Sequence, residues 1–140
     1  MSAGNWTFYN DFKEKLAKAE IDLDNDTLKC LLTTSSYTPS ATHSVLTDIT
    51  NECADSDYAR QTLGSVTVTE TGGTVTFDCA DISFGSAVTI TAKYAVLFDD
   101  TATNDPLLVY VDLDTGGGSV SSTSSTFQIT INASGVFTLA

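Results

Sequence analysis

Hydrophobic and polar residues alternate along several short segments of the chain, most clearly over residues 88–98. Every second residue from Val88 to Phe98 is apolar or aromatic, while Thr89, Thr91 and Lys93 occupy the alternate positions. Near the end of the segment both sets of positions are apolar. This period of two predicts one long β-strand that is solvated on one face at its start and buried on both faces at its end.

A tight hairpin is predicted at Gly72 and Gly73, between segments 61–70 and 74–79, because glycine readily adopts the positive φ that such a turn requires. Further strands are predicted at 27–34, 107–113, 126–132 and 135–139, with a turn at 132–135 and a weaker strand at 45–49. Segments 35–44 and 114–125 are predicted loops. Thr occurs 23 times in the chain, which favours strands because a β-branched side chain fits a pleated surface.

The number and spacing of these strands predict an all-β fold in which two antiparallel sheets pack as a β-sandwich. An immunoglobulin-like sandwich and a jelly roll both fit this pattern. The Cys-Trp-Cys spacing of antibody domains is absent, because the only tryptophan, Trp6, precedes every predicted strand. We therefore favour a jelly roll in a single domain, residues 1–140, with a helix and arm at 1–20 and the sandwich at 27–140.

The N-terminal segment departs from the β pattern and predicts an amphipathic helix of about twelve residues. Its apolar residues recur at spacings of three and four: Phe8, Tyr9, Phe12, Leu16 and Ala19. Half of the six basic residues lie on the opposite side, which predicts a positive spot on an acidic molecule. The helix either closes one open end of the sandwich or contacts another subunit, because interface cores favour aromatic residues. The second interpretation makes the partner-binding candidates Trp6, Phe8, Tyr9, Phe12, Lys13, Lys15 and Lys18.

Charge and composition restrict the possible partners. The chain of 140 residues has 18 acidic and 6 basic side chains, a net charge of -12. Such a surface repels phosphate backbones and anionic lipid head groups, so we expect neither nucleic acid nor a membrane as a partner. The longest apolar runs are far shorter than a membrane helix requires. The first residues lack the basic and apolar parts of a secretion signal, which predicts synthesis in a cytoplasm.

The sequence offers little sign of catalytic or metal chemistry. Asp22, Asp24 and Asp26 open like a calcium-binding EF-hand loop, but its sixth and twelfth positions are threonines, so we expect an acidic turn instead. His43 is the only histidine, and the three cysteines show no zinc-ligand spacing and are expected to be buried thiols. We expect no enzyme, cofactor or metal, although 18 acidic residues leave a pair of glycosidase carboxylates open.

Several segments together resemble a family of small virion proteins of tailed bacteriophages. They are NWTFYNDF at 5–12, IDL at 21–23, DTLK at 26–29, LLTTSSYTP at 31–39 with His43, TITAKYAVL at 89–97, PLL at 106–108, VD at 111–112 and NASGVFTL at 132–139. The resemblance covers most of the chain. It implies a protein similar to the jelly-roll cement, or decoration, proteins that stabilise a phage capsid from its outer surface.

That resemblance carries further expectations. It implies a protein made in the bacterial host cytoplasm and located on the virion, whose partners are the major capsid protein and further copies of itself in a homodimer or homotrimer. The alternative is a phage tail or fibre component that adheres to the host surface, for which Tyr37 and Tyr58 are the candidate exposed loop aromatics. A carbohydrate-binding module is a third interpretation.

Overall fold

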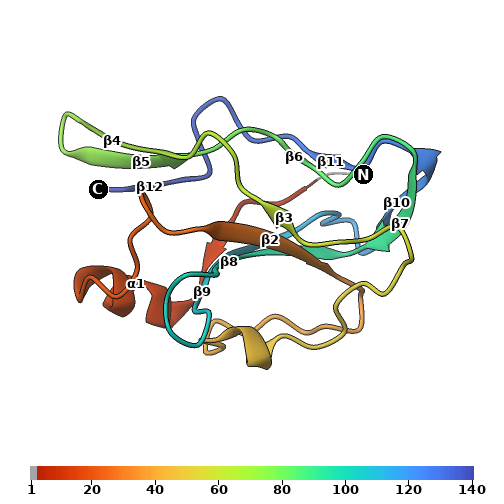
Figure 1. Cartoon of the computed structure of the whole chain (residues 1–140), viewed down its shortest axis with the longest axis horizontal. Coiled ribbons are helices and arrows are strands. Elements are labelled where there is room, and N and C mark those ends of the chain that lie inside the picture. The colour runs from red at the N-terminus through yellow and green to blue at the C-terminus, as the bar shows by residue number, and fades with distance from the viewer. Residues whose placement is uncertain (1–2) are drawn as a thin grey trace.

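The computed structural model describes residues 3–140 and shows an all-β protein of antiparallel sheets with one short α-helix, α1 (Asn10–Ala17) (Figure 1). A 3-10 turn, η1, spans Leu46–Asp48. The strands are β1 (Thr7–Phe8), β2 (Leu28–Thr33), β3 (Gln61–Thr62), β4 (Thr67–Thr71), β5 (Thr74–Asp78), β6 (Ile82–Ser83), β7 (Val88–Ala92), β8 (Tyr94–Asp99), β9 (Leu107–Asp112), β10 (Val120–Ser125), β11 (Gln128–Ile129) and β12 (Phe137–Leu139).

The largest sheet has the order β1-β9-β8-β2-β3. Three smaller sheets, β12-β5-β4, β11-β6 and β10-β7, complete the fold. In Figure 1 the sheets β12-β5-β4 and β11-β6 form a layer above the five-stranded sheet, whereas α1 and the segment containing η1 lie below it. This arrangement confirms the predicted all-β sandwich. It does not confirm a jelly roll, because the strands are not divided between two four-stranded sheets.

The core lies between these layers and includes side chains from every part of the chain. Leu97 and Leu108 come from the two central strands of the large sheet, Phe77 and Ile90 from the smaller sheets and Phe12 from α1, and all five are fully buried. Burying one such side chain contributes roughly 1.5–3 kcal/mol relative to leaving it in water. The core therefore ties the helix and both layers into one packed unit.

The predicted long strand at 88–98 is two strands that belong to different sheets. β7 pairs with β10, whereas β8 pairs with β2 and β9. The change occurs at Lys93, whose N–H donates to the carbonyl of Thr33 and whose carbonyl accepts from the N–H of Leu113, both at 2.8 Å. The alternation of side chains continues through this point, so the period of two did not reveal the change of sheet.

The Gly72–Gly73 hairpin is confirmed, with φ angles of 59° and 88° joining β4 to β5. Other predictions need correction. The segment predicted as a strand at 45–49 contains η1 instead, because the Asp48 carboxylate accepts the N–H groups of Ser44 at 2.8 Å and Val45 at 3.1 Å. The predicted loop 114–125 ends in β10, which is held by pairing with β7.

The C-terminal strands also differ from prediction. The turn at 132–135 is present, with the N–H of Gly135 donating to the carbonyl of Asn132 at 2.8 Å. The strands on its two sides do not pair with each other, since β11 pairs with β6 and β12 with β5. The turn therefore carries the chain from one small sheet to the next instead of closing a hairpin.

Candidate functional site

The N-terminal arm lies along an edge of the large sheet. β1 pairs with β9, with Thr7 opposite Tyr110 and Phe8 opposite Val109, and the N–H of Tyr9 donates to the carbonyl of Leu108 at 3.1 Å. Phe8 and Tyr9 thus precede the helix, which begins at Asn10 and is shorter than predicted. The helix turns away from the strand and directs Phe12 into the core.

Four phenylalanine rings join the arm and helix to the smaller sheet β12-β5-β4. Phe137 lies at their centre, with its ring centroid 5.0 Å from Phe8, 5.0 Å from Phe77 and 5.7 Å from Phe12. Centroid distances of this size are typical of favourable aromatic pairs. The helix therefore closes one end of the sandwich, as the first of its two interpretations predicted.

Two of the aromatic partner-binding candidates are buried where the helix closes the sandwich. Tyr9 and Phe12 both have an exposed fraction of 0%. They offer no surface to a partner, which corrects the expectation that they contact another subunit. Trp6 and Phe8 are only half-buried, and Phe8 is already packed on Phe12 and Phe137. Trp6 is therefore the aromatic candidate with the most surface free of the ring cluster.

The Tyr9 hydroxyl is part of a buried chain of hydrogen bonds. It lies 3.1 Å from the Tyr37 hydroxyl, which lies 2.8 Å from Nδ1 of His43. Burial, and then the bond to Tyr37, raise the pKa of Tyr9 far above its ordinary value. The chain ties the start of the helix to the 35–44 loop and keeps Tyr9 neutral.

The three lysine candidates do not form the predicted positive spot. Lys15 lies 3.4 Å from Asp11 and 3.6 Å from Glu20, and Lys18 pairs with Glu14. Lys13 has no ion pair among residues 3–140, and its Nζ lies 5.7 Å from the centroid of the Phe8 ring. Acidic side chains of the same segment thus balance the basic ones, so the helix presents mixed charge.

An open groove of about 720 Å³ runs beside the arm, and we refer to it as the Trp6 groove. Three parts of the chain line it: residues 3–6, Val111 and Leu113 of the β9 region, and residues 129–132 and 134–137. A smaller hollow of about 300 Å³ extends it toward Val120 and Phe127. The half-buried apolar side chains along the groove are Trp6, Val120, Ile129, Ile131 and Phe137.

Of the residues that line this groove, only Trp6 was predicted from the sequence to bind a partner. Ile129 and Ile131 belong to an alternating segment that predicted a strand, but the pattern could not show that this segment lies beside the N-terminal arm. A surface with several partly exposed apolar residues along one concave strip is typical of a site that binds another protein. Trp6 is the one predicted interaction residue that lines this groove.

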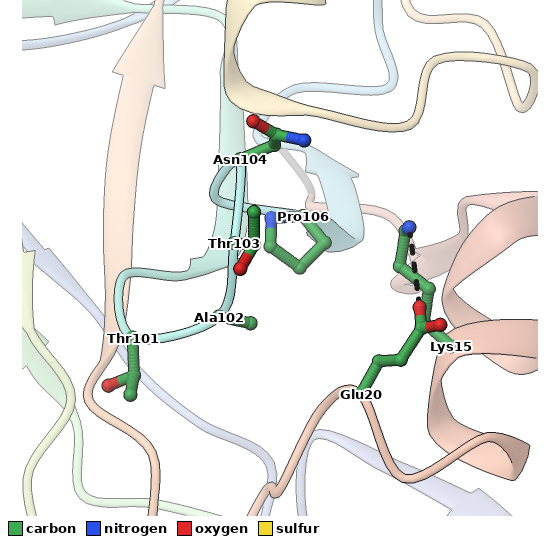
Figure 2. Close-up of a pocket in the computed structure, with 7 residues that line it drawn as sticks. All are labelled: Lys15, Glu20, Thr101, Ala102, Thr103, Asn104 and Pro106. Atoms are coloured by element: carbon green, nitrogen blue, oxygen red, sulfur yellow. Dashed lines mark ion pairs between the residues drawn. The ribbon is translucent and has the colours of Figure 1, made fainter.

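A second pocket, of about 520 Å³, separates the end of α1 from the loop between β8 and β9. Figure 2 shows the paired side chains of Lys15 and Glu20 on one side and the loop from Thr101 to Pro106 on the other. Glu20 is the one carboxylate among the seven residues drawn there. The two neighbouring carboxylates that a glycosidase uses are therefore not brought together in this pocket.

The acidic segment 22–26 forms the predicted turn. Oδ1 of Asp22 accepts the N–H groups of Asp24 and Asn25, both at 3.1 Å, and Oδ2 of Asp26 accepts the N–H of Asp22 at 3.0 Å. Within the part of the chain that the structure describes, no group of three or more His, Cys, Asp or Glu residues could hold a metal ion. The three cysteines are free and buried, as predicted.

None of the helices within residues 3–140 has the length and hydropathy needed to cross a bilayer. Comparison of the chain with protein-family models, with curated proteins and with solved structures found no match.

Proposed function

We propose that this chain is a structural virion protein of a tailed bacteriophage, a capsid cement or decoration protein that binds the outer surface of the major capsid protein shell. The family resemblance of the sequence supports the virion role. The observation that carries the binding role is the Trp6 groove, a strip of partly exposed apolar side chains on a packed all-β domain.

Binding free energy performs this function without a chemical step. A packaged genome presses outward on its shell, and a protein that bridges neighbouring coat subunits raises the free energy needed to separate them. The repeated symmetric sites of a shell favour a symmetric homodimer or homotrimer of the bound protein. Two or three linked contacts raise the overall affinity by roughly 10² to 10⁴ when their spacing matches the sites.

Trp6 is the residue on which we expect attachment to depend most. Tryptophan is enriched among the few residues that carry most of the free energy of an interface. It lines the same groove as the apolar residues Ile129, Ile131 and Phe137, so an apolar side chain of the coat protein that entered the groove would be removed from water. The charge of -12 on the rest of the chain then keeps decorated particles apart in solution.

The test is attachment of purified protein to capsids that lack it, measured by co-sedimentation. Trp6→Ala and Ile131→Ala are each expected to weaken binding at least tenfold, on the order of the 1.4 kcal/mol or more that interface anchors contribute. Val68→Ala is the matched control, because Val68 is also half-buried and apolar but lies on β4, outside the groove. Equal binding of all three variants and the parent would contradict the use of this groove.

Copy number distinguishes the capsid role from the alternative of a tail or fibre component. Quantitative densitometry of purified virions is expected to show hundreds of copies per particle, whereas a handful would place the protein in the tail. The structure weakens the sugar-adhesion argument for the alternative. Tyr37 is buried and bonded to Tyr9, and the Tyr58 ring stacks on Phe84 at 6.1 Å, so neither loop tyrosine presents a free ring.

A further inference from the structure

Asp99, the last residue of β8, has a carboxyl group with one satisfied and one unsatisfied oxygen. Its exposed fraction is 0%. Oδ1 accepts the N–H groups of Thr101 at 2.8 Å and Ala102 at 3.1 Å, which forms the turn that follows the strand. Oδ2 is buried and has no hydrogen-bond donor among residues 3–140. A buried carboxylate oxygen without a donor is costly, by about 1–3 kcal/mol or more, so its environment requires an explanation.

Asp26 lies next to Asp99, because the two residues that follow Asp26 are bonded to the segment around Asp99. The backbone holds the two residues together, because Leu28 pairs with Asp99 between β2 and β8. The N–H of Asp100 donates to the carbonyl of Thr27, and the N–H of Thr27 donates to the hydroxyl of Thr101, both at 2.8 Å. Two carboxyl groups held this closely cannot both be ionised at low cost.

The neighbouring basic groups are already paired with other acids. Lys29 lies 3.0 Å from Asp100, Lys15 lies beside Asp11 and Glu20, and Arg60 binds Glu52. The remaining charges on the adjoining turn and loop are acidic, at Asp22, Asp24 and Asp105. Among residues 3–140, no Lys or Arg forms an ion pair with either Asp26 or Asp99. Repulsion between the two carboxylates is thus relieved most directly by a proton.

We propose that Asp26 and Asp99 share one proton, and that this proton fastens the acidic turn 22–26 to the loop 100–105. A protonated carboxyl donates one O–H, which supplies the missing donor between the two groups. The proposal concerns the stability of this junction and does not depend on attachment to a capsid.

The electrostatics of the pair agree with this geometry. Burial, and then the hydrogen bond with Asp26, raise the pKa of Asp99 to about 7, against the opposing effect of the N–H groups of Ala102 and Thr101. The proton would therefore be lost over a pH range near neutrality.

The junction has a structural consequence at the pocket of Figure 2. The loop that follows Asp99 supplies one side of that pocket, from Thr101 to Asn104. Asn104 and Asp105 have φ angles of 67° and 48°, a region that non-glycine residues adopt at some cost. Contacts at both ends of the loop maintain this conformation, and the shared proton supports the end at Asp99. Loss of the proton should therefore loosen this side of the pocket first.

The experiment follows the carboxyl carbons and the loop amides of the full chain by NMR from pH 4 to 9. We expect one carboxyl of the pair to titrate near pH 7, and the amides of Thr101 and Ala102 to exchange at least threefold faster, beyond the intrinsic pH effect, once it has ionised. Asp99→Asn keeps an oxygen acceptor for both amides and gains an NH₂ donor toward Asp26. It is expected to abolish this pH dependence.

Asp26→Asn is the reciprocal variant and is also expected to abolish the pH dependence of amide exchange. Having two variants keeps the test valid if one of them folds poorly. Asp100→Asn is the control, since this acid is exposed and paired with Lys29, and its pH profile should match that of the parent. Titration of both carboxyls below pH 5 would overturn the proposal.

Discussion

Nζ of Lys93 lies 2.8 Å from Oδ1 of Asp112, at the residue where the chain passes from β7 into β8. The Lys93 side chain is 8% exposed and that of Asp112 is 32% exposed. Lys93 also donates to the backbone carbonyl of Asp114. The ammonium group is therefore almost completely removed from water, and its charge is balanced by a carboxylate that retains some contact with solvent.

This asymmetry predicts that the two partners are not equally replaceable. Asp112→Ala leaves a buried ammonium without its counter-charge and is expected to lower the free energy of unfolding by about 3 kcal/mol. Lys93→Met removes the buried charge itself and leaves a partly hydrated carboxylate, so a loss of about 1 kcal/mol is expected. Urea unfolding followed by circular dichroism measures both values. A larger loss for Lys93→Met than for Asp112→Ala would show that an unpaired buried ammonium group is not the main cause of instability at this position.

The region around Lys93 also shows what the sequence could and could not predict. Alternation over 88–98 located the strands, because β7 buries one face and β8 is buried on both. The change of sheet at Lys93 depends on pairing with Thr33 and Leu113, which are far away in sequence, and leaves the local period unchanged. Strand existence was therefore predictable, whereas sheet membership was not, and the predicted jelly roll is not confirmed.

The candidate site shows the same limit. The spacing of Phe8, Tyr9 and Phe12 indicated an apolar face but not which part of the chain covers it. Phe137, which is 125 residues beyond Phe12 in sequence, covers that face together with Phe77. Ion pairs within the helix likewise cancel a charge pattern that appeared one-sided when only the lysines were considered. The long-range partners decide which candidates remain accessible.

Because Tyr9, Tyr37 and His43 form a hydrogen-bonded chain, we expect Tyr37→Phe and Tyr9→Phe to lower the free energy of unfolding by different amounts. Tyr37→Phe deprives the buried Tyr9 hydroxyl and Nδ1 of His43 of their shared partner, so a loss of about 2 kcal/mol in unfolding free energy is expected. Tyr9→Phe removes the buried hydroxyl together with its need for a partner and leaves the Tyr37–His43 bond intact, so about 1 kcal/mol or less is expected.

The double variant, Tyr9→Phe with Tyr37→Phe, tests whether the two hydroxyls act as one network. It is expected to lose less than the sum of the single losses, because no unpaired hydroxyl remains on Tyr9. Thermal and urea unfolding of the four proteins provide the cycle. Strict additivity would mean that the 3.1 Å contact between the hydroxyls contributes nothing to stability.

Glu52 predicts a loss of stability in acid. Burial raises the pKa of its carboxyl, but hydrogen bonds from Arg60 and Tyr58 outweigh burial and leave the pKa below its ordinary value. A carboxyl whose pKa is lower in the folded state stabilises the protein above its unfolded pKa of about 4.3, and this contribution is lost as pH falls toward the folded value.

Glu52→Gln is therefore expected to cost about 1 kcal/mol at pH 7, where the parent carboxylate is ionised, since the pair with Arg60 is partly exposed to solvent. The difference should shrink as the pH is lowered from about 5 to 3. Urea midpoints of parent and variant at several pH values measure it. A difference that is constant over this range would mean that the shape of the side chain, not its charge, makes the contribution.

Gly135 is the glycine at which we expect an added methyl group to lower the free energy of unfolding most. Its φ is 93°, and a Cβ built there would lie 2.8 Å from Cγ2 of Thr76 and 2.9 Å from the carbonyl oxygen of Phe77. The carbonyl of Phe77 cannot move freely, because it accepts the N–H of Val136 at 2.8 Å. Gly135→Ala must therefore strain the backbone and also separate the last turn from β5.

Gly117→Ala is the matched control, because its φ is 96° and nothing lies within 4 Å of the added Cβ. We expect about 1 kcal/mol for Gly117→Ala from backbone strain alone, and at least about 3 kcal/mol for Gly135→Ala, where overpacking adds to the strain. Urea unfolding gives both values. Equal losses would show that the last turn can move away from β5 without cost, and that the packing of Phe137 against Phe77 does not depend on the close approach at Gly135.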